Sequence, residues 1–112
     1  MLAKAIARYV RMTPRKVGYV ITPLRKQTVA QALAQLSLTN RRAAGPVAKL
    51  VASAFANARQ KQPELRPEDV VISRVYANEG SRWKRFRAAA FGRAAGILKR
   101  TSHITVELEK RA

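Results

Sequence analysis

The chain has apolar residues at helical spacing through its middle and at alternate positions toward its ends. A first helix is predicted after Thr13, whose hydroxyl can cap a free N–H, with Pro14 at the first helical position. Its apolar stripe consists of Val17, Val20, Ile21 and Leu24. We expect Pro23 to end this helix, because proline cannot continue the hydrogen-bond ladder.

Two further helices are predicted before residue 62. Thr28 can cap the second. Its expected buried face consists of Val29, Ala32, Leu33 and Leu36. The third and longest should run from about Arg41 to Lys61, with Pro46 near its start, so it either begins near Ala44 or is kinked. Residues 62–69 hold two prolines and three of the six acidic residues, and this turn-rich connector should face away from an anionic partner.

Strands are predicted on both sides of the helices. Residues 2–10 alternate imperfectly and are interpreted as a first strand. A second strand is expected over 70–78 and a return strand over 101–108. Their alternating residues are Val71, Ser73 and Val75 in one and Ile104, Val106 and Leu108 in the other. The order of elements predicts an α+β fold, with three helices packed on a small antiparallel sheet.

Residues 80–106 contain seven Lys or Arg and no Asp or Glu. A connection of about twenty residues without helix or strand period usually means a functional loop or a segment ordered by a partner. We expect a long protruding β-hairpin whose tip lies against a polyanion. The 112 residues should form a single domain, with a globular body over 1–78 and 102–112 and an extended arm over about 79–101.

Composition narrows the function. The net charge is +17, which favours nucleic acid as the partner, with an acidic membrane surface second, and 47% hydrophobic residues suffice for a folded body. There is no Cys, and one His with six scattered acids offers no nucleophile with a base and no metal cluster. We therefore expect no enzyme, no cofactor and no metal. No secretory signal or membrane span is found, so use within the compartment of synthesis is expected.

Two groups of basic residues are the candidate binding sites. The loop group consists of Arg82, Lys84, Arg85, Arg87, Arg93, Lys99 and Arg100. The second group consists of Arg8, Arg11, Arg15 and Lys16, joined by Arg41 and Arg42, within residues 1–63 that contain no acid. Trp83, Phe86 and Phe91 either anchor the loop or stack on unpaired bases. His103 lies on the strand face opposite Ile104 and Val106, so it is expected to be exposed or in contact with RNA.

Four binding functions are weighed at this point. A DNA helix-turn-helix is disfavoured, because the second helix offers only Gln31 and Gln35 to base edges, so phosphate and shape recognition of structured RNA is favoured. A free-standing basic regulator of RNA or DNA is the alternative. A cationic membrane-active protein ranks last, because the basic residues gather in a non-helical loop.

Several motifs are familiar in combination and order. They are AKAIARYVRMTPRKV (3–17), TNRRAAGPVAKLVASAFANA (39–58), YANEG (76–80), WKRF (83–86), GRA (92–94) and KRTSHITV (99–106). Over nearly its whole length the chain resembles the bacterial large-subunit ribosomal protein L twenty-two family. The chain departs from the family pattern in several places. Ala88 to Ala90 replace a usual Pro-Arg-Ala run, and Phe91 stands where a basic residue is common. Trp83 replaces a smaller apolar residue, and Lys26 and Gln27 stand where the family usually has Gly and Lys.

The resemblance implies a structural ribosomal protein that binds large-subunit rRNA and supports subunit assembly, with its body near the tunnel exit and its hairpin lining the exit tunnel. Its partners would be the rRNA, neighbouring ribosomal proteins and the nascent polypeptide, with no membrane and no small-molecule substrate. Its location would be a cytoplasmic ribosome, or an organellar one. The implied rRNA contacts are Arg11, Arg15, Lys16, Lys84, Arg85, Lys99, Arg100, Thr101, Ser102 and His103. The implied tunnel tip is Ala89, Ala90, Phe91, Gly92 and Arg93.

Overall fold

The computed structural model describes residues 2–88 and 94–111. Within them the chain runs through one strand, three α-helices with two short 3-10 turns, and two long strands. The elements are β1 (Ala3–Val10), α1 (Pro14–Ile21), α2 (Val29–Leu38), α3 (Ala44–Lys61), β2 (Val70–Ala88) and β3 (Ala94–Lys110), with the 3-10 turns at Thr22–Leu24 and Pro67–Asp69. The predicted α+β class is confirmed.

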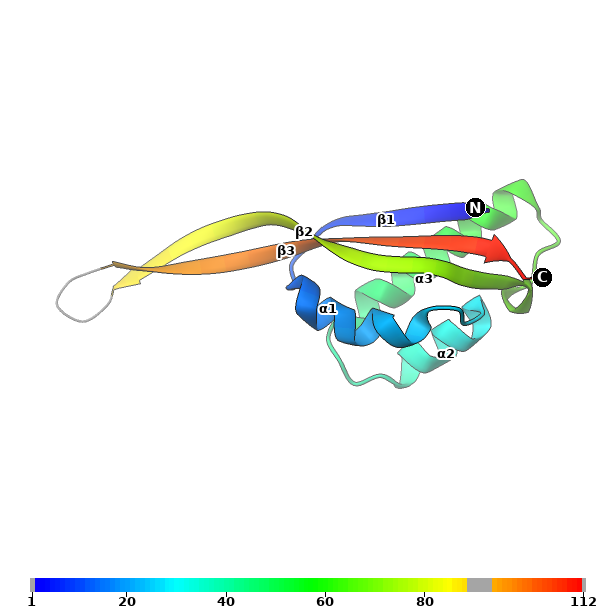
Figure 1. Cartoon of the computed structure of the whole chain (residues 1–112), viewed down its shortest axis with the longest axis horizontal. Helices are drawn as coiled ribbons and strands as arrows, with labels where there is room; N and C mark the ends of the chain where they lie inside the picture. The colour runs from blue at the N-terminus through cyan, green and yellow to red at the C-terminus, as the bar shows by residue number, and fades with distance from the viewer. Residues whose placement is uncertain (1, 89–93, 112) are drawn as a thin grey trace.

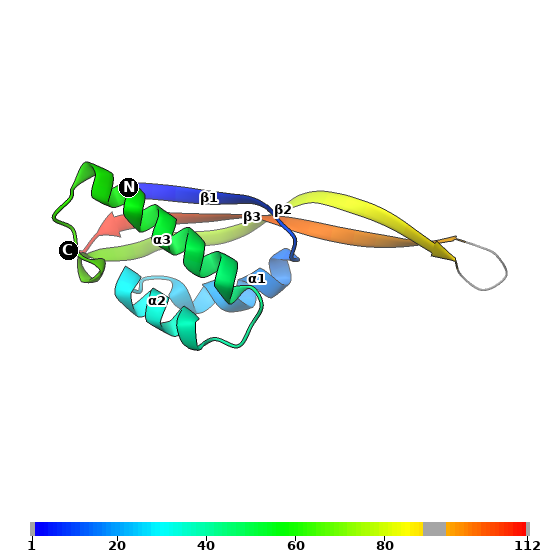
Figure 2. The ribbon, with the colours of Figure 1, turned by 180° about the vertical axis from the view of Figure 1, so that it is seen from behind.

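The three strands form one antiparallel sheet in the order β1-β3-β2 (Figure 1). Helix α3 packs against β1 and β3, α1 packs against β2, and α2 packs on α3. Figure 2 shows α3 lying across one face of the sheet, with α1 and α2 along its lower side, while the view in Figure 1 is onto the opposite face. The described helices therefore cover a single face of the sheet.

The core lies between the helices and the sheet, with buried residues from all three helices and all three strands. Ile104, Val106 and Leu108 are fully buried, as their alternation predicts. On β2 the buried positions do not follow the alternation of Val71, Ser73 and Val75, because Val70, Ile72 and Val75 are buried, whereas Val71 and Ser73 are only partly so. The ladder shifts register between Ile72 and Arg74, and the Ser73 hydroxyl donates to the Glu107 carbonyl at 3.1 Å. This β-bulge moves the buried positions out of strict alternation.

The helix starts follow the predicted caps. The Thr13 side chain accepts from the Lys16 N–H, and Thr28 forms a capping box with Gln31. Helix α1 ends at Ile21 and passes into the 3-10 turn that contains Pro23. Helix α3 begins at Ala44 rather than Arg41, so Pro46 is its third residue, where a missing N–H costs no helical bond.

Beyond the helices, β2 and β3 continue as a paired two-stranded arm (Figure 1). The ladder runs from Arg82 opposite Arg100 to Ala88 opposite Ala94, so the expected strand ends at 78 and 101 are wrong. The expected protruding β-hairpin is confirmed, and its paired strands extend farther than the predicted strand ends. Main-chain pairing suffices to form a strand, and alternation is imposed only where one face is buried. The molecule is 64 Å long and 25 Å across its second axis.

The arm leaves the body at a junction where two strands are irregular. Register shifts occur between Ala7 and Val10 on β1 and between Glu79 and Arg82 on β2. Tyr9 takes a left-handed conformation with φ 57°, and its N–H donates to His103 Nδ1 at 3.1 Å. Bulges sharpen the local twist of a strand. The arm therefore starts beside two irregular stretches of strand, where the Tyr9 N–H is hydrogen-bonded to His103.

Candidate nucleic-acid interface

Six basic residues lie around the base of the arm, and we call them the basal cluster. They are Arg8, Arg11, Arg15, Lys16, Arg41 and Arg42, all of them exposed or partly exposed. They come from the end of β1, the start of α1 and the turn before α3. Figures 1 and 2 both place the end of β1 and the start of α1 where the arm leaves the body. The fold therefore brings together basic residues that are up to 34 positions apart in the sequence.

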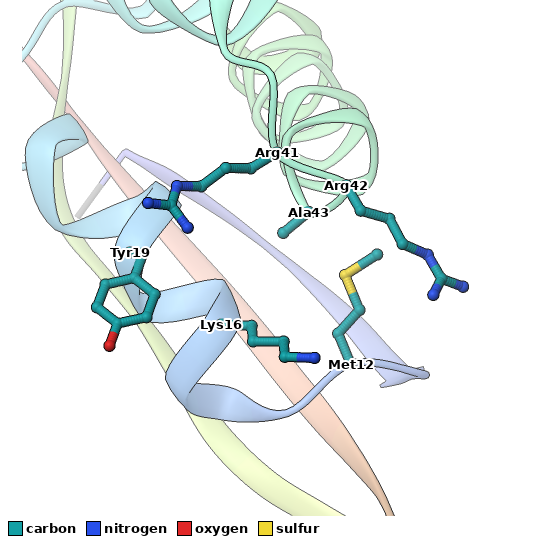
Figure 3. A pocket seen from close by; sticks show the side chains of 6 residues that line it. All are labelled: Met12, Lys16, Tyr19, Arg41, Arg42 and Ala43. Carbon is teal, nitrogen blue, oxygen red and sulfur yellow. The ribbon is translucent and has the colours of Figure 1, made fainter.

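Part of the basal cluster lines a pocket of about 420 Å³ (Figure 3). Its lining is Met12, Lys16, Tyr19, Arg41, Arg42 and Ala43. The Arg41 guanidinium lies over the Tyr19 ring, 5.1 Å from its centroid, and Arg15 Nε donates to the Tyr19 hydroxyl at 3.2 Å. This pocket joins cationic side chains to an aromatic and apolar wall.

The predicted basic residues of the arm lie on both of its strands. Arg82, Lys84, Arg85 and Arg87 are in β2, and Lys99 and Arg100 are in β3. Arg82 is paired with Arg100, and Trp83 with Lys99, in the main-chain register. The predicted tip residues Ala89, Ala90, Phe91, Gly92 and Arg93 lie outside the described residues. Both strands of the arm thus carry basic residues, and Arg82 and Arg100 lie opposite each other.

Three predicted contacts on the returning strand have structural roles. Thr101 is 2% exposed and Ser102 is fully buried, and the Ser102 hydroxyl donates to the Met12 carbonyl at 2.6 Å. His103 is half-buried, and its ring meets that of Tyr9 edge-on with centroids 4.8 Å apart. The side chains of Thr101 and Ser102 are therefore buried in this structure, and the His103 imidazole contacts Tyr9.

Charge is segregated along the molecule. Residues 1–63 contain no acid, whereas Glu64, Glu68, Asp69 and Glu109 lie near the start of β2 or the end of β3. Figure 1 shows those strand ends at the side of the body away from the arm. The far end also carries basic residues that offset these acids, namely Lys61, Arg66, Lys110 and Arg111. A polyanion is therefore attracted most strongly to the arm and its base.

The described part of the chain offers little chemistry besides charge. It holds no group of three or more His, Cys, Asp or Glu that could bind a metal ion. Among these residues, too, no helix combines the length and apolarity needed to cross a bilayer.

Sequence reasoning missed Tyr19 and Met12 as lining residues of the pocket. A signal for Tyr19 exists, because it follows Arg15 by four positions and Lys16 by three, so all three side chains project from neighbouring positions on α1. No local signal places Met12 beside Ala43, because their approach depends on how α1 packs near the start of α3.

Comparison with known proteins points to the same family that the sequence motifs resemble. The family model for ribosomal protein L22p/L17e matches residues 5–109. The large ribosomal subunit protein uL22 of Macrococcus caseolyticus is 48% identical over 106 residues, which span 95% of this chain and 85% of the relative. The uL22 protein of Staphylococcus aureus strain JH9 is 45% identical over 106 residues, spanning 95% of this chain and 90% of the relative. The resemblance is confirmed, and the chain belongs to the ribosomal protein L22p/L17e family, whose members are structural constituents of the large ribosomal subunit.

Proposed function

We propose that this chain binds large-subunit rRNA through two joined surfaces, the basal cluster and the arm, and so supports folding of that RNA during assembly. The observation that carries the proposal is the position of the basal cluster at the base of a basic two-stranded arm. One surface alone would follow a single phosphate backbone. Two surfaces that meet at an angle suit a folded RNA with several backbones near one another.

The arm, in this proposal, lines the wall of the nascent-peptide exit tunnel, where it meets the growing polypeptide. Its narrow, elongated shape supports this, since a two-stranded ribbon reaches deep into RNA while displacing little of it. The body lies beside neighbouring ribosomal proteins. The ribosome concerned is cytoplasmic or belongs to an organelle with bacterial-type translation.

Sequence-specific reading of duplex DNA is a poor fit to α2. Its two amide side chains are Gln31 and Gln35, and the hydroxyl of its serine, Ser37, donates to the Ala34 carbonyl at 2.7 Å. Gln31 is engaged in the capping box with Thr28, and Gln35 Oε1 accepts from Gln27 Nε2 at 2.9 Å. Neither amide is presented for base reading, which supports recognition of RNA shape and phosphate.

The experiment that tests the proposal measures binding of the purified chain to large-subunit rRNA and to duplex DNA of equal mass across a salt series. We expect rRNA binding to survive moderate salt while DNA binding collapses, because non-specific binding is almost wholly counterion release. Equal loss on both nucleic acids would mean that the +17 charge alone binds, and would contradict recognition of folded rRNA.

A further inference from the structure

The pocket in the basal cluster has a composition that phosphate binding does not explain. Lys16, Arg41 and Arg42 are exposed and could neutralise phosphates without any cavity. The rest of the lining is the Tyr19 ring, Met12 and the buried Ala43 (Figure 3). An apolar and aromatic wall gains from a ligand only if that ligand also presents an apolar or aromatic surface.

Tyr19 is exposed and yet held in place. It is 52% exposed, its hydroxyl accepts from Arg15, and its ring carries the planar guanidinium of Arg41. Aromatic rings and arginine planes are the two surfaces on which proteins stack unpaired bases. Because both partners of Tyr19 are already in contact with it, a ligand would cost little side-chain freedom on binding.

We propose that this pocket takes one unpaired nucleotide of the rRNA, with its base stacked on the Tyr19–Arg41 pair and its phosphate held by Lys16 and Arg42. The inference rests on the rRNA binding proposed above and adds a point where a base, rather than the backbone, is recognised. A cavity of about 420 Å³ lies within the range of about 300 to 1,000 Å³ that holds small ligands. An acidic peptide would pair with the cations, but a nucleotide joins negative charge and a flat ring in one unit.

The test compares two tyrosines that each carry an arginine. Tyr19→Leu removes the stacking surface, whereas Tyr76→Leu is the matched control, because Arg74 lies 5.4 Å from the Tyr76 ring on another part of the body. We expect Tyr19→Leu to weaken rRNA binding by about five-fold to a hundred-fold and to leave the salt slope unchanged, since no charge is removed. Tyr76→Leu and Tyr19→Phe should bind within about two-fold of the original chain, the latter because its ring is kept.

Three results would overturn the proposal. Full-strength binding of Tyr19→Leu, in a chain that prefers rRNA to duplex DNA, would exclude the stacked base and leave the proposed rRNA function standing. Binding of Tyr19→Phe as weak as that of Tyr19→Leu would show that the hydroxyl, not the ring, matters. No preference of the original chain for rRNA would remove both proposals together.

A second measurement needs no variant and so does not depend on folding of Tyr19→Leu. Ultraviolet cross-linking of the original chain bound to large-subunit rRNA, followed by mass spectrometry, should give a peptide with a nucleotide attached at Tyr19. Primer extension should stop at a single nucleotide outside a helix. Stops spread along a duplex, or bound RNA with no adduct at Tyr19, would contradict base recognition in this pocket.

Discussion

The Ser102 hydroxyl donates a 2.6 Å hydrogen bond to the Met12 carbonyl across 90 positions of sequence. This bond joins the central strand, where the arm begins, to the segment that leads into α1 and the basal cluster. Ser102 is fully buried and Met12 is partly buried. This hydroxyl thus helps to hold the segment beside the basal cluster against the strand from which the arm extends.

Ser102→Ala should lower the free energy of unfolding by about 1 to 3 kcal/mol, because the Met12 carbonyl is left without this donor. Urea unfolding measures this. Ser37→Ala is the matched control, since the Ser37 hydroxyl makes a 2.7 Å bond to Ala34 at an exposed helix position, and its removal should change stability by less than about 0.5 kcal/mol. Equal stability of the two variants would contradict the role given to Ser102.

Gly80→Ala should destabilise the junction. A Cβ at Gly80 would lie 2.5 Å from Thr101 Oγ1 and 3.1 Å from His103 Cε1, so these side chains or the strands that carry them must shift, at a cost of about 1 to 3 kcal/mol. Gly18→Ala is the control, because nothing lies within 4 Å of its Cβ, and alanine in that helix should add about 0.4 to 1 kcal/mol.

A double-mutant cycle with Thr101→Ala checks the cause of the Gly80 effect. The second change removes the Oγ1 atom that the new Cβ would meet. The destabilisation due to Gly80→Ala should therefore be smaller in the Thr101→Ala background. If the two changes instead lower the free energy of unfolding additively, the close approach of Gly80 and Thr101 is not the cause of the destabilisation by Gly80→Ala.

Lys26→Gly should stabilise the chain. Lys26 is an exposed residue with φ 66°, a left-handed conformation that costs a side-chain residue about 1 to 2 kcal/mol and glycine almost nothing. Part of that gain is offset by the freedom glycine has when unfolded, so the expected rise is about 0.5 to 1 kcal/mol by thermal or urea unfolding. Arg25→Gly, at an ordinary φ of −61°, should instead lower stability, and a fall with both would contradict the strain at Lys26.

Charge on the arm should set the salt dependence of rRNA binding. Changing Lys84, Arg85, Arg87 and Arg93 to Gln should lower the slope of log K against log salt by about 0.7 to 0.9 for each phosphate that the arm no longer neutralises. The control removes the same charge away from the arm, by changing the exposed residues Lys49, Arg66, Lys110 and Arg111 to Gln. Equal slopes for the two variants would mean that binding follows net charge and that the arm does not contact phosphate.

The sequence predicts what local chemistry decides. The caps at Thr13 and Thr28 and the buried alternation of Ile104, Val106 and Leu108 are all confirmed, because each depends on a few neighbouring residues. The phase of β2 was not predictable, because the bulge at Ser73 is visible only against its partner strand. The protruding hairpin was expected, but the strand ends within it were placed wrongly, because main-chain pairing leaves no hydrophobic alternation in the sequence.

The candidate site also has parts that the sequence predicts and parts that only the folded structure reveals. Charge alone identified the basal cluster, since residues 1–63 are free of acids. The pocket could not be predicted, because it forms only when α1 lies beside the turn that precedes α3. The buried state of Ser102 was hidden for a similar reason, since its partner, the Met12 carbonyl, is a main-chain atom that carries no sequence signal.

Cryo-electron microscopy of large ribosomal subunits assembled with this chain tests the central claim most directly. Our account predicts density for the chain with the basal cluster against rRNA at the base of the arm, and with β2 and β3 running inward along the exit tunnel. An arm directed into solvent, a basal cluster away from RNA, or subunits that lack the chain would contradict it.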